Sequence, residues 1–265
     1  MRKLLPLLLT AALLLSCLTS CFVIPDVDGY LDDVISQNRG EDLDKLINGV
    51  AHDAVLSGVI VSATHYSGFQ KKESQGSGVI YRLYDRYFYV LTNYHVVYNN
   101  GSNLNTVYTV IDAFDTAHNA TLVAADESLD LAVIRFVATS DDIERLKIAT
   151  LATKDPSVST VVLSVGNPGG LHNAISLGDI LSYNDVGLDS LSIPVMYHTA
   201  PVDHGSSGGG VYDTDGLLVG INYALGQSED GEATMSFAVP IGCVREFLLA
   251  NGILPTEQDE SEDQN

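Results

Sequence analysis

From Gly58 onward, short apolar runs rich in β-branched and aromatic residues alternate with turn-forming segments. Runs of this length and composition are typical of β-strands rather than helices. An Asp215-Gly216 pair between two such runs is a strong hairpin signal, and Gly-Asn-Pro-Gly-Gly at 166–170 marks another turn. The clearest strand candidates are residues 59–65, 87–92, 132–137, 160–165 and 217–223. Many short strands without helices between them predict an all-β barrel or sandwich.

Helical spacing of apolar residues occurs only near the two ends of this β-rich region. Residues 41–56 predict a short helix, and residues 240–252 predict a helix that closes the domain. We therefore expect a tether with a short helix over 21–54 and a single domain over 55–252. Residues 253–265 contain the run Glu-Gln-Asp-Glu-Ser-Glu-Asp, which predicts a solvated, disordered acidic tail.

The N-terminus has the features of an export signal. Arg2 and Lys3 precede an almost wholly apolar run that ends near residue 18, which is short for a membrane span of roughly 20 residues. The segment Leu-Thr-Ser-Cys that ends at Cys21 resembles a bacterial lipobox. Residues 1–20 are thus predicted to be a lipoprotein signal peptide, with Cys21 lipidated and anchoring the exported protein to the extracytoplasmic side of the cell membrane. Ordinary signal cleavage with an incidental cysteine is the alternative.

Composition and charge exclude several classes of function. The net charge of −21 repels phosphate backbones, so nucleic-acid binding is disfavoured. The 46% share of hydrophobic residues is typical of a packed globular protein. If Cys21 carries lipid, Cys243 has no partner for a disulfide and is expected to be a small buried apolar residue. No metal-ligand spacing occurs, and no cofactor is expected.

Ser207 is the candidate nucleophile. It lies in the glycine-rich segment Asp-His-Gly-Ser-Ser-Gly-Gly-Gly-Val at 203–211. A serine hydroxyl is a weak nucleophile that needs an adjacent base, and the oxyanion formed on attack needs aimed N–H donors. Flanking glycines let the backbone turn its own N–H groups toward a substrate carbonyl. We expect the N–H groups of Gly205 and Ser207 to form the oxyanion hole.

His95 and Asp130 are the candidate partners of Ser207. His95 follows the apolar run Tyr-Val-Leu-Thr, and the end of a strand presents a side chain rigidly. Imidazole exchanges protons near neutral pH, as a general base requires. Asp130 directly precedes the apolar run 131–136, which would carry its carboxylate toward the interior. There it can accept the imidazole N–H, fix the tautomer and stabilise the imidazolium.

The order His, Asp, Ser on an all-β background is that of the chymotrypsin arrangement. Together with other blocks over roughly 55–250, it resembles the protease domain of the HtrA/Deg family of trypsin-like serine proteases. The blocks that carry the resemblance are Gly-Ser-Gly-Val-Ile at 76–80, Leu-Thr-Asn-Tyr-His-Val-Val at 91–97, Asp-Leu-Ala-Val-Ile at 130–134, Gly-Asn-Pro-Gly-Gly at 166–170, Gly-Ser-Ser-Gly-Gly at 205–209 and Phe-Ala-Val-Pro at 237–240.

This resemblance implies a chymotrypsin-like double β-barrel with a C-terminal helix and a site in the cleft between the barrels. It implies proteolysis of unfolded or misfolded polypeptides outside the cytoplasm, without cofactors. Family members often form homo-trimers, and no residue here decides for or against that assembly. They commonly continue into a peptide-binding PDZ domain, which is not expected after the closing helix. The family usually has Asn-Pro-Gly-Asn before the nucleophile where this chain has Asp-His-Gly-Ser at 203–206, and this departure bears on the oxyanion hole.

Specificity is predicted from two segments. If the segment Gly-Ile-Asn-Tyr at 220–223 lines the substrate edge, an incoming peptide can pair there as an added strand, with Gly220, Ile221 and Asn222 as substrate-binding residues. The wall near Pro201 and Val202 offers no carboxylate, so small or medium aliphatic side chains are preferred over Lys or Arg.

Two other functions stay open. A protease-like lipoprotein could serve as a binding or scaffold module, although an intact triad argues against it. A glutamyl endopeptidase could recognise a substrate carboxylate through a histidine such as His198, but the acidity of the chain makes acidic substrates less attractive.

Overall fold

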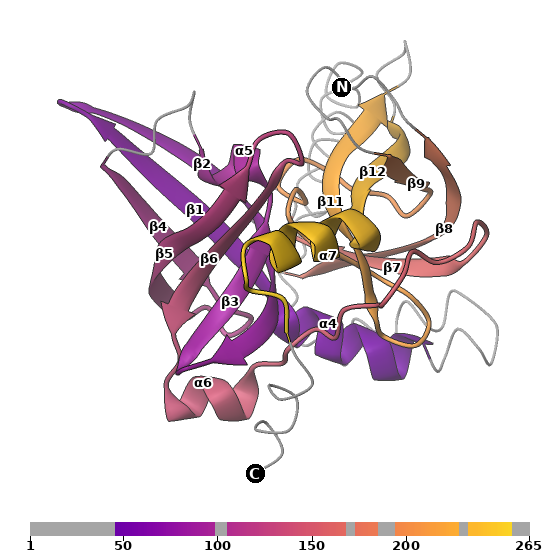
Figure 1. Ribbon diagram of the computed structural model, residues 1–265, viewed down its shortest axis with the longest axis horizontal. Helices are drawn as coiled ribbons and strands as arrows, with labels where there is room; N and C mark the ends of the chain where they lie inside the picture. Colours follow the sequence, from indigo (N-terminus) through magenta and orange to yellow (C-terminus); the bar gives the residue numbers. More distant parts are fainter. Residues whose placement is uncertain (1–45, 99–104, 168–172, 185–193, 228–232, 256–265) are drawn as a thin grey trace, which may run out of the picture.

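Figure 1 shows the computed structural model, which describes residues 46–98, 105–167, 173–184, 194–227 and 233–255. The expected signal peptide, Cys21 and the acidic residues after 255 lie outside the described residues. The chain forms two closed barrels of six strands each, and every strand pair within them is antiparallel. The prediction of an all-β double barrel with a C-terminal helix is therefore confirmed.

The first barrel closes because its first strand pairs with both the second and the fourth. Around the barrel the strand order is β1-β2-β3-β6-β5-β4. Its interior is filled by apolar residues that alternate along the strands, such as Val90 on β3 and Ile134 on β6, which are both fully buried. The strands are β1 (Gly58–Ser67), β2 (Gln70–Tyr84), β3 (Tyr87–Thr92), β4 (Thr106–Ile111), β5 (Ala117–Asp126) and β6 (Leu131–Val137).

The second barrel has the order β10-β11-β12-β9-β8-β7 and closes through pairing of β10 with β7. One glycine is essential to its closure: a Cβ at Gly178 on β8 would lie 2.0 Å from the backbone nitrogen of Ala200. Only glycine allows so close an approach of two backbones. The strands are β7 (Val161–Gly166), β8 (Ala174–Asn184), β9 (Val195–His198), β10 (Gly210–Tyr212), β11 (Leu218–Gln227) and β12 (Ala233–Pro240).

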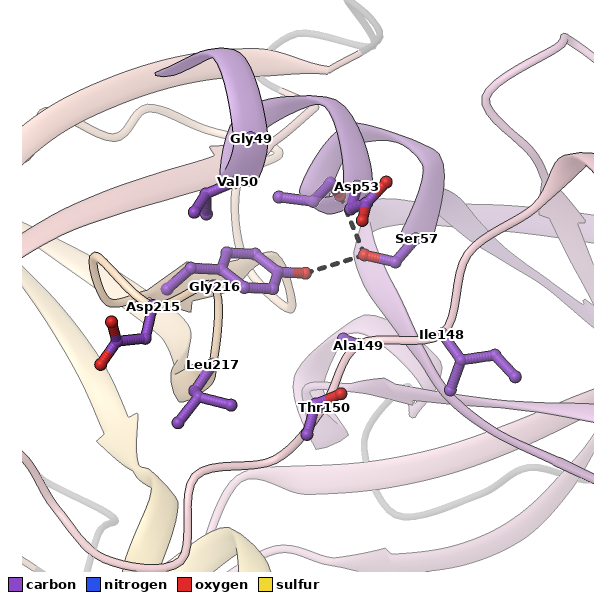
Figure 2. A pocket seen from close by; sticks show the side chains of 12 residues that line it. Gly49, Val50, Asp53, Ser57, Ile148, Ala149, Thr150, Asp215, Gly216 and Leu217 are labelled. Carbon is purple, nitrogen blue, oxygen red and sulfur yellow. Dashed lines mark hydrogen bonds between the residues drawn. The ribbon is translucent and has the colours of Figure 1, made fainter. Parts of the chain in front are cut away.

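The predicted N-terminal helix forms and belongs to the domain. A π-helical turn η1 (Leu46–Ala51) continues into α4 (His52–Ser57), and Ala51, Ala54 and Val55 are buried in the core that includes the second barrel. The expected tether therefore ends earlier than residue 54. Figure 2 shows the pocket that these helices form with the segment 148–150 and the turn 215–217. None of the predicted site residues lines this pocket.

The closing helix α7 (Ile241–Ala250) lies against strands β11 and β12, and its side chains Val244, Phe247 and Leu248 are buried. Packing continues past residue 252, the expected domain boundary, to Ile253 and Leu254. Ile253 is buried in the core, and the hydroxyl of Tyr81 on β2 donates to its carbonyl at 3.2 Å. The C-terminal segment thus ties the second barrel to the first.

Two short helices complete the described structure. They are α5 (Tyr94–Val97), which follows β3, and α6 (Ser140–Arg145), whose first turn is closed by a capping box between Thr139 and Asp142. Within the described ranges, every helix is too short or too polar to cross a membrane.

Candidate active site

His95 and Asp130 are brought together by the pairing of β3 with β6. His95 lies on α5, just after the end of β3, and Asp130 directly precedes β6. The ring Nδ1 of His95 lies 2.7 Å from Oδ2 of Asp130, and the backbone N–H of His95 donates to Oδ1 at 2.9 Å. Because a carboxylate only accepts, this geometry assigns the ring proton to Nδ1 and leaves Nε2 as the basic nitrogen.

The backbone of Asp130 is held in an unusual conformation. Its φ of +48° lies in the left-handed region, which aspartate tolerates better than most residues. The buried side chain of Asn93, two residues before His95, donates from Nδ2 to the Asp130 carbonyl at 2.9 Å. Asn93 therefore fixes the backbone of Asp130 beside the segment that carries His95.

The loop that carries Ser207 is closed by backbone hydrogen bonds. Ser206 N–H donates to the carbonyl of Asp203, and Gly208 N–H donates to the carbonyl of Asn222. Gly205 has a φ of +99°, a conformation that favours glycine. Among the described residues, neither Gly205 nor Ser207 has an acceptor for its N–H. The two N–H groups expected to bind an oxyanion are the ones that this loop leaves without partners.

The hydroxyl of Ser207 is hydrogen-bonded to a backbone carbonyl rather than to His95 in this structure. It donates to the carbonyl of Tyr223 on β11, with an O···O distance of 3.2 Å. The ring of His95 lies edge-on to the ring of Tyr223, with centroids 6.1 Å apart. The serine hydroxyl must therefore exchange the Tyr223 carbonyl for Nε2 of His95 as its acceptor before the imidazole can take its proton.

The first barrel also holds the backbone of the Ser207 loop. The N–H of Ser77 on β2 donates to the carbonyl of Ser207 at 2.7 Å, and Thr92 Oγ1 donates to the carbonyl of Ser77. A Cβ at Gly208 would lie 2.1 Å from that same Ser77 carbonyl, and the φ of Gly208 is +88°. The contact between the barrels thus requires glycine immediately after Ser207.

The predicted role of Gly220, Ile221 and Asn222 in pairing with an incoming peptide is wrong. These residues lie on β11 between β12 on one side and either β10 or the Ser207 loop on the other, so both edges of their backbone are occupied. The side chain of Asn222 is buried and donates to Ser164. Because β10 begins at Gly210, which pairs with Ile221, and the Ser207 loop pairs with Asn222, β11 extends beyond both only from residue 223 onward.

The remaining residues predicted to recognise substrate are Pro201, Val202 and His198. Pro201 is exposed and Val202 half-buried in the segment leading to Ser207, so their role in specificity stays a prediction. His198 is fully buried on β9, and burial lowers the pKa of its ring to about 4. A side chain without access to the surface cannot bind a substrate carboxylate, so that role for His198 is wrong.

One group of potential metal ligands occurs among the described residues, in the first barrel. Suitable atoms of Asp112, His118 and Asp142 lie within 4.8 Å of one another. Each carboxylate already has a local function: Asp112 accepts two backbone N–H groups of its turn and contacts His118, and Asp142 caps α6. This hydrogen bonding explains the cluster without an ion.

Two residues that contact the site were not singled out in the sequence. Ser77 and Asn93 each stand within a segment used above, but no local pattern distinguishes them. Their contacts with Ser207 and Asp130 join residues 130 and 37 positions apart, so they become evident only when the barrels are closed.

Comparisons with known proteins match this chain to peptidases. The family model of the trypsin-like peptidase domain matches residues 76–221. The serine endoprotease DegS of Escherichia coli (strain K12) is 34% identical over 185 residues, 68% of this chain and 47% of that protein. A probable periplasmic serine endoprotease of Brucella suis, described as DegP-like, is 30% identical over 185 residues, 68% of this chain and 33% of its own length.

A solved structure of the HtrA-type protease AlgW with a decapeptide has the same fold. Its TM-score is 0.62 at 24% identity, covering 78% of this chain and 67% of that one. The chain thus spans about half or less of the length of these curated relatives.

Proposed function

The chain belongs to the trypsin-like peptidases, with an HtrA-like protease domain, and we propose that it is a serine endopeptidase in which Ser207, His95 and Asp130 cleave polypeptides. The observation that carries the proposal is the His95–Asp130 pair at 2.7 Å beside a loop with two unpartnered N–H groups. A base held by a carboxylate and a vacant pair of N–H donors are what acyl transfer through a serine requires.

In the proposed mechanism, the Ser207 hydroxyl turns from the Tyr223 carbonyl toward Nε2 of His95. The imidazole takes the hydroxyl proton as the oxygen attacks the scissile carbonyl carbon, and Asp130 stabilises the imidazolium through Nδ1. The N–H groups of Gly205 and Ser207 bind the oxyanion. His95 then gives the proton to the leaving amine, and water hydrolyses the acyl-enzyme by the same steps with His95 again acting as base.

Substrate binding itself is proposed to release the nucleophile. A peptide that pairs with the available edge of β11 would donate an N–H to the carbonyl of Tyr223, which the Ser207 hydroxyl occupies in this structure. Competition for that carbonyl would free the hydroxyl to turn toward His95. Small and medium aliphatic side chains remain the proposed preference, next to Pro201 and Val202.

Unfolded or misfolded polypeptides outside the cytoplasm are the proposed substrates, with Cys21 as the lipid attachment site. Replacement of Cys21 by alanine should move the protein from the membrane fraction to the soluble one in cells that export it. Retention of this variant in the membrane fraction would contradict the anchor and leave the protease proposal untouched.

A fluorophosphonate probe tests the catalytic proposal directly, because it reacts only with an activated serine. The folded wild-type protein should be labelled at Ser207, and labelling should vanish in Ser207→Ala and fall steeply in His95→Ala. Ser57→Ala is the matched control, since Ser57 is a buried serine outside the site, and it should be labelled like the wild type. Absence of labelling in folded wild-type protein would favour a binding or scaffold module instead.

A further inference from the structure

Ser77 joins the first barrel to the loop that carries Ser207 through its side chain as well as its backbone. This serine on β2 is fully buried. Its hydroxyl donates to the carbonyl of Gly205 at 2.7 Å and accepts from the backbone N–H of Asn167 at 2.8 Å and from Asn167 Nδ2 at 3.3 Å. A hydroxyl has one proton and two lone pairs, so its hydrogen-bonding capacity is fully used.

Asn167 is itself held firmly, so Ser77 is anchored on both sides. Asn167 follows the end of β7 and is almost completely buried. Its Nδ2 also donates to the carbonyl of Val59 on β1 at 2.9 Å, and its Oδ1 accepts from the N–H of Asn173 at 2.9 Å. The proton of the Ser77 hydroxyl therefore has one direction left, toward Gly205.

The peptide unit between Gly205 and Ser206 is consequently held at both ends. Its carbonyl accepts from Ser77, and its N–H donates to the carbonyl of Asp203 at 2.9 Å. The N–H of Ser77 holds the carbonyl of Ser207 at 2.7 Å. The Ser206–Ser207 peptide, which carries the Ser207 N–H, lies between these two held groups. The Gly205 N–H belongs to the peptide unit directly before them.

We propose that Ser77 is a positioning residue that sets the orientation of the oxyanion-binding N–H groups of Gly205 and Ser207. This inference rests on the proposed function, because it assigns Ser77 to the same site. Ser77 does not touch the reacting atoms and acts through the loop. Without its hydroxyl, the Gly205 carbonyl and the buried backbone N–H of Asn167 lose their partner, and the flexible glycine backbone gains other orientations.

The consequence is a loss of turnover rather than of substrate binding. Loss of a single oxyanion donor in a serine protease lowers kcat by about 100- to 1000-fold. We expect Ser77→Ala to lower kcat about 10- to 1000-fold, since misorientation weakens the donors without removing them. KM for a peptide substrate should change by less than about threefold. The pH at which activity falls to half should stay unchanged, because the His95–Asp130 pair makes no contact with the Ser77 hydroxyl.

The experiment compares the wild type with Ser77→Ala, Ser77→Thr and the matched control Ser57→Ala, whose buried hydroxyl bonds to Ala54 and Tyr212. Hydrolysis of a peptide ester is followed from pH 5 to 9, and thermal melting reports folding. Ser77→Thr keeps a hydroxyl and should recover kcat relative to the alanine variant. A kcat for Ser77→Ala within twofold of the control, or a shifted pH midpoint with an unchanged plateau, would overturn the proposal.

Amide hydrogen exchange gives a readout that does not depend on activity. The Ser206 N–H should exchange faster in Ser77→Ala than in the wild type, and at the wild-type rate in Ser57→Ala. If the wild type hydrolyses no ester but exchange responds in this way, the proposed function fails while the anchoring role stands. If Ser77→Ala does not fold, Ser77→Cys, which keeps the volume but is a weak donor, is measured in its place. Unchanged kcat and exchange in that variant would equally refute the role.

Discussion

Acid should destabilise the second barrel through His198, because this ring is fully buried on β9 between β8 and β12. Burial lowers its pKa from 6.5 to about 4. Among the described residues, no hydrogen bond of ordinary geometry reaches either ring nitrogen, and Asn222 and the backbone of Ala200 raise the pKa less than burial lowers it. The folded protein therefore keeps this ring neutral over a pH range in which the unfolded chain protonates it.

The size of the effect follows from these two values. Between pH 6.5 and 4 the unfolded state binds one more proton at this site, so the free energy of unfolding falls as the pH falls. The contribution of His198 is fully present above pH 6.5. It is lost by about 0.8 kcal/mol at pH 6 and by about 2.5 kcal/mol at pH 4.5, and the loss levels off below pH 4.

Urea unfolding of the wild type and His198→Leu at pH 7.5, 6.0, 5.0 and 4.5 measures this contribution. Leucine cannot titrate. Between pH 7.5 and 4.5 the free energy of unfolding should therefore fall by about 2 to 3 kcal/mol less in the variant than in the wild type. The control is His204→Leu, which replaces an exposed histidine with the same residue. Equal slopes for the wild type and His198→Leu would refute the reasoning, whichever protein is more stable at neutral pH.

Three substitutions test other contacts. Asn93→Ala removes the buried donor to the Asp130 carbonyl, so stability should fall by about 1–3 kcal/mol in urea unfolding. Ester hydrolysis should slow with it, and a wild-type kcat would show that Asn93 does not position the carboxylate. Gly208→Ala places a Cβ 2.1 Å from the Ser77 carbonyl at a φ of +88°, so fluorophosphonate labelling should be lost; normal labelling would disprove the close approach. Tyr212→Phe removes the phenolic hydroxyl that is hydrogen-bonded to the hydroxyl of Ser57 at 3.0 Å. The free energy of unfolding in urea should fall by about 1 kcal/mol, and kcat should stay unchanged.

Local sequence determined the elements and singled out the candidate reacting groups. Alternating apolar runs and the Asp215-Gly216 turn predicted strands and a hairpin that the structure contains. The order of His95, Asp130 and Ser207 on this background pointed to the fold that both barrels confirm. These features are readable because a strand's period of two and the conformation of a tight turn depend on residues that are neighbours in the chain.

Tertiary structure alone decided which groups are available for chemistry. The prediction that a peptide pairs at Gly220–Asn222 failed because β10, β12 and the Ser207 loop occupy both edges there, and only barrel closure reveals this. The burial of His198 and the anchoring of Gly205 by Ser77 have the same origin. Such contacts join residues up to 128 positions apart, and a hydrogen-bond partner at that distance depends on how two barrels pack together, which no local pattern encodes.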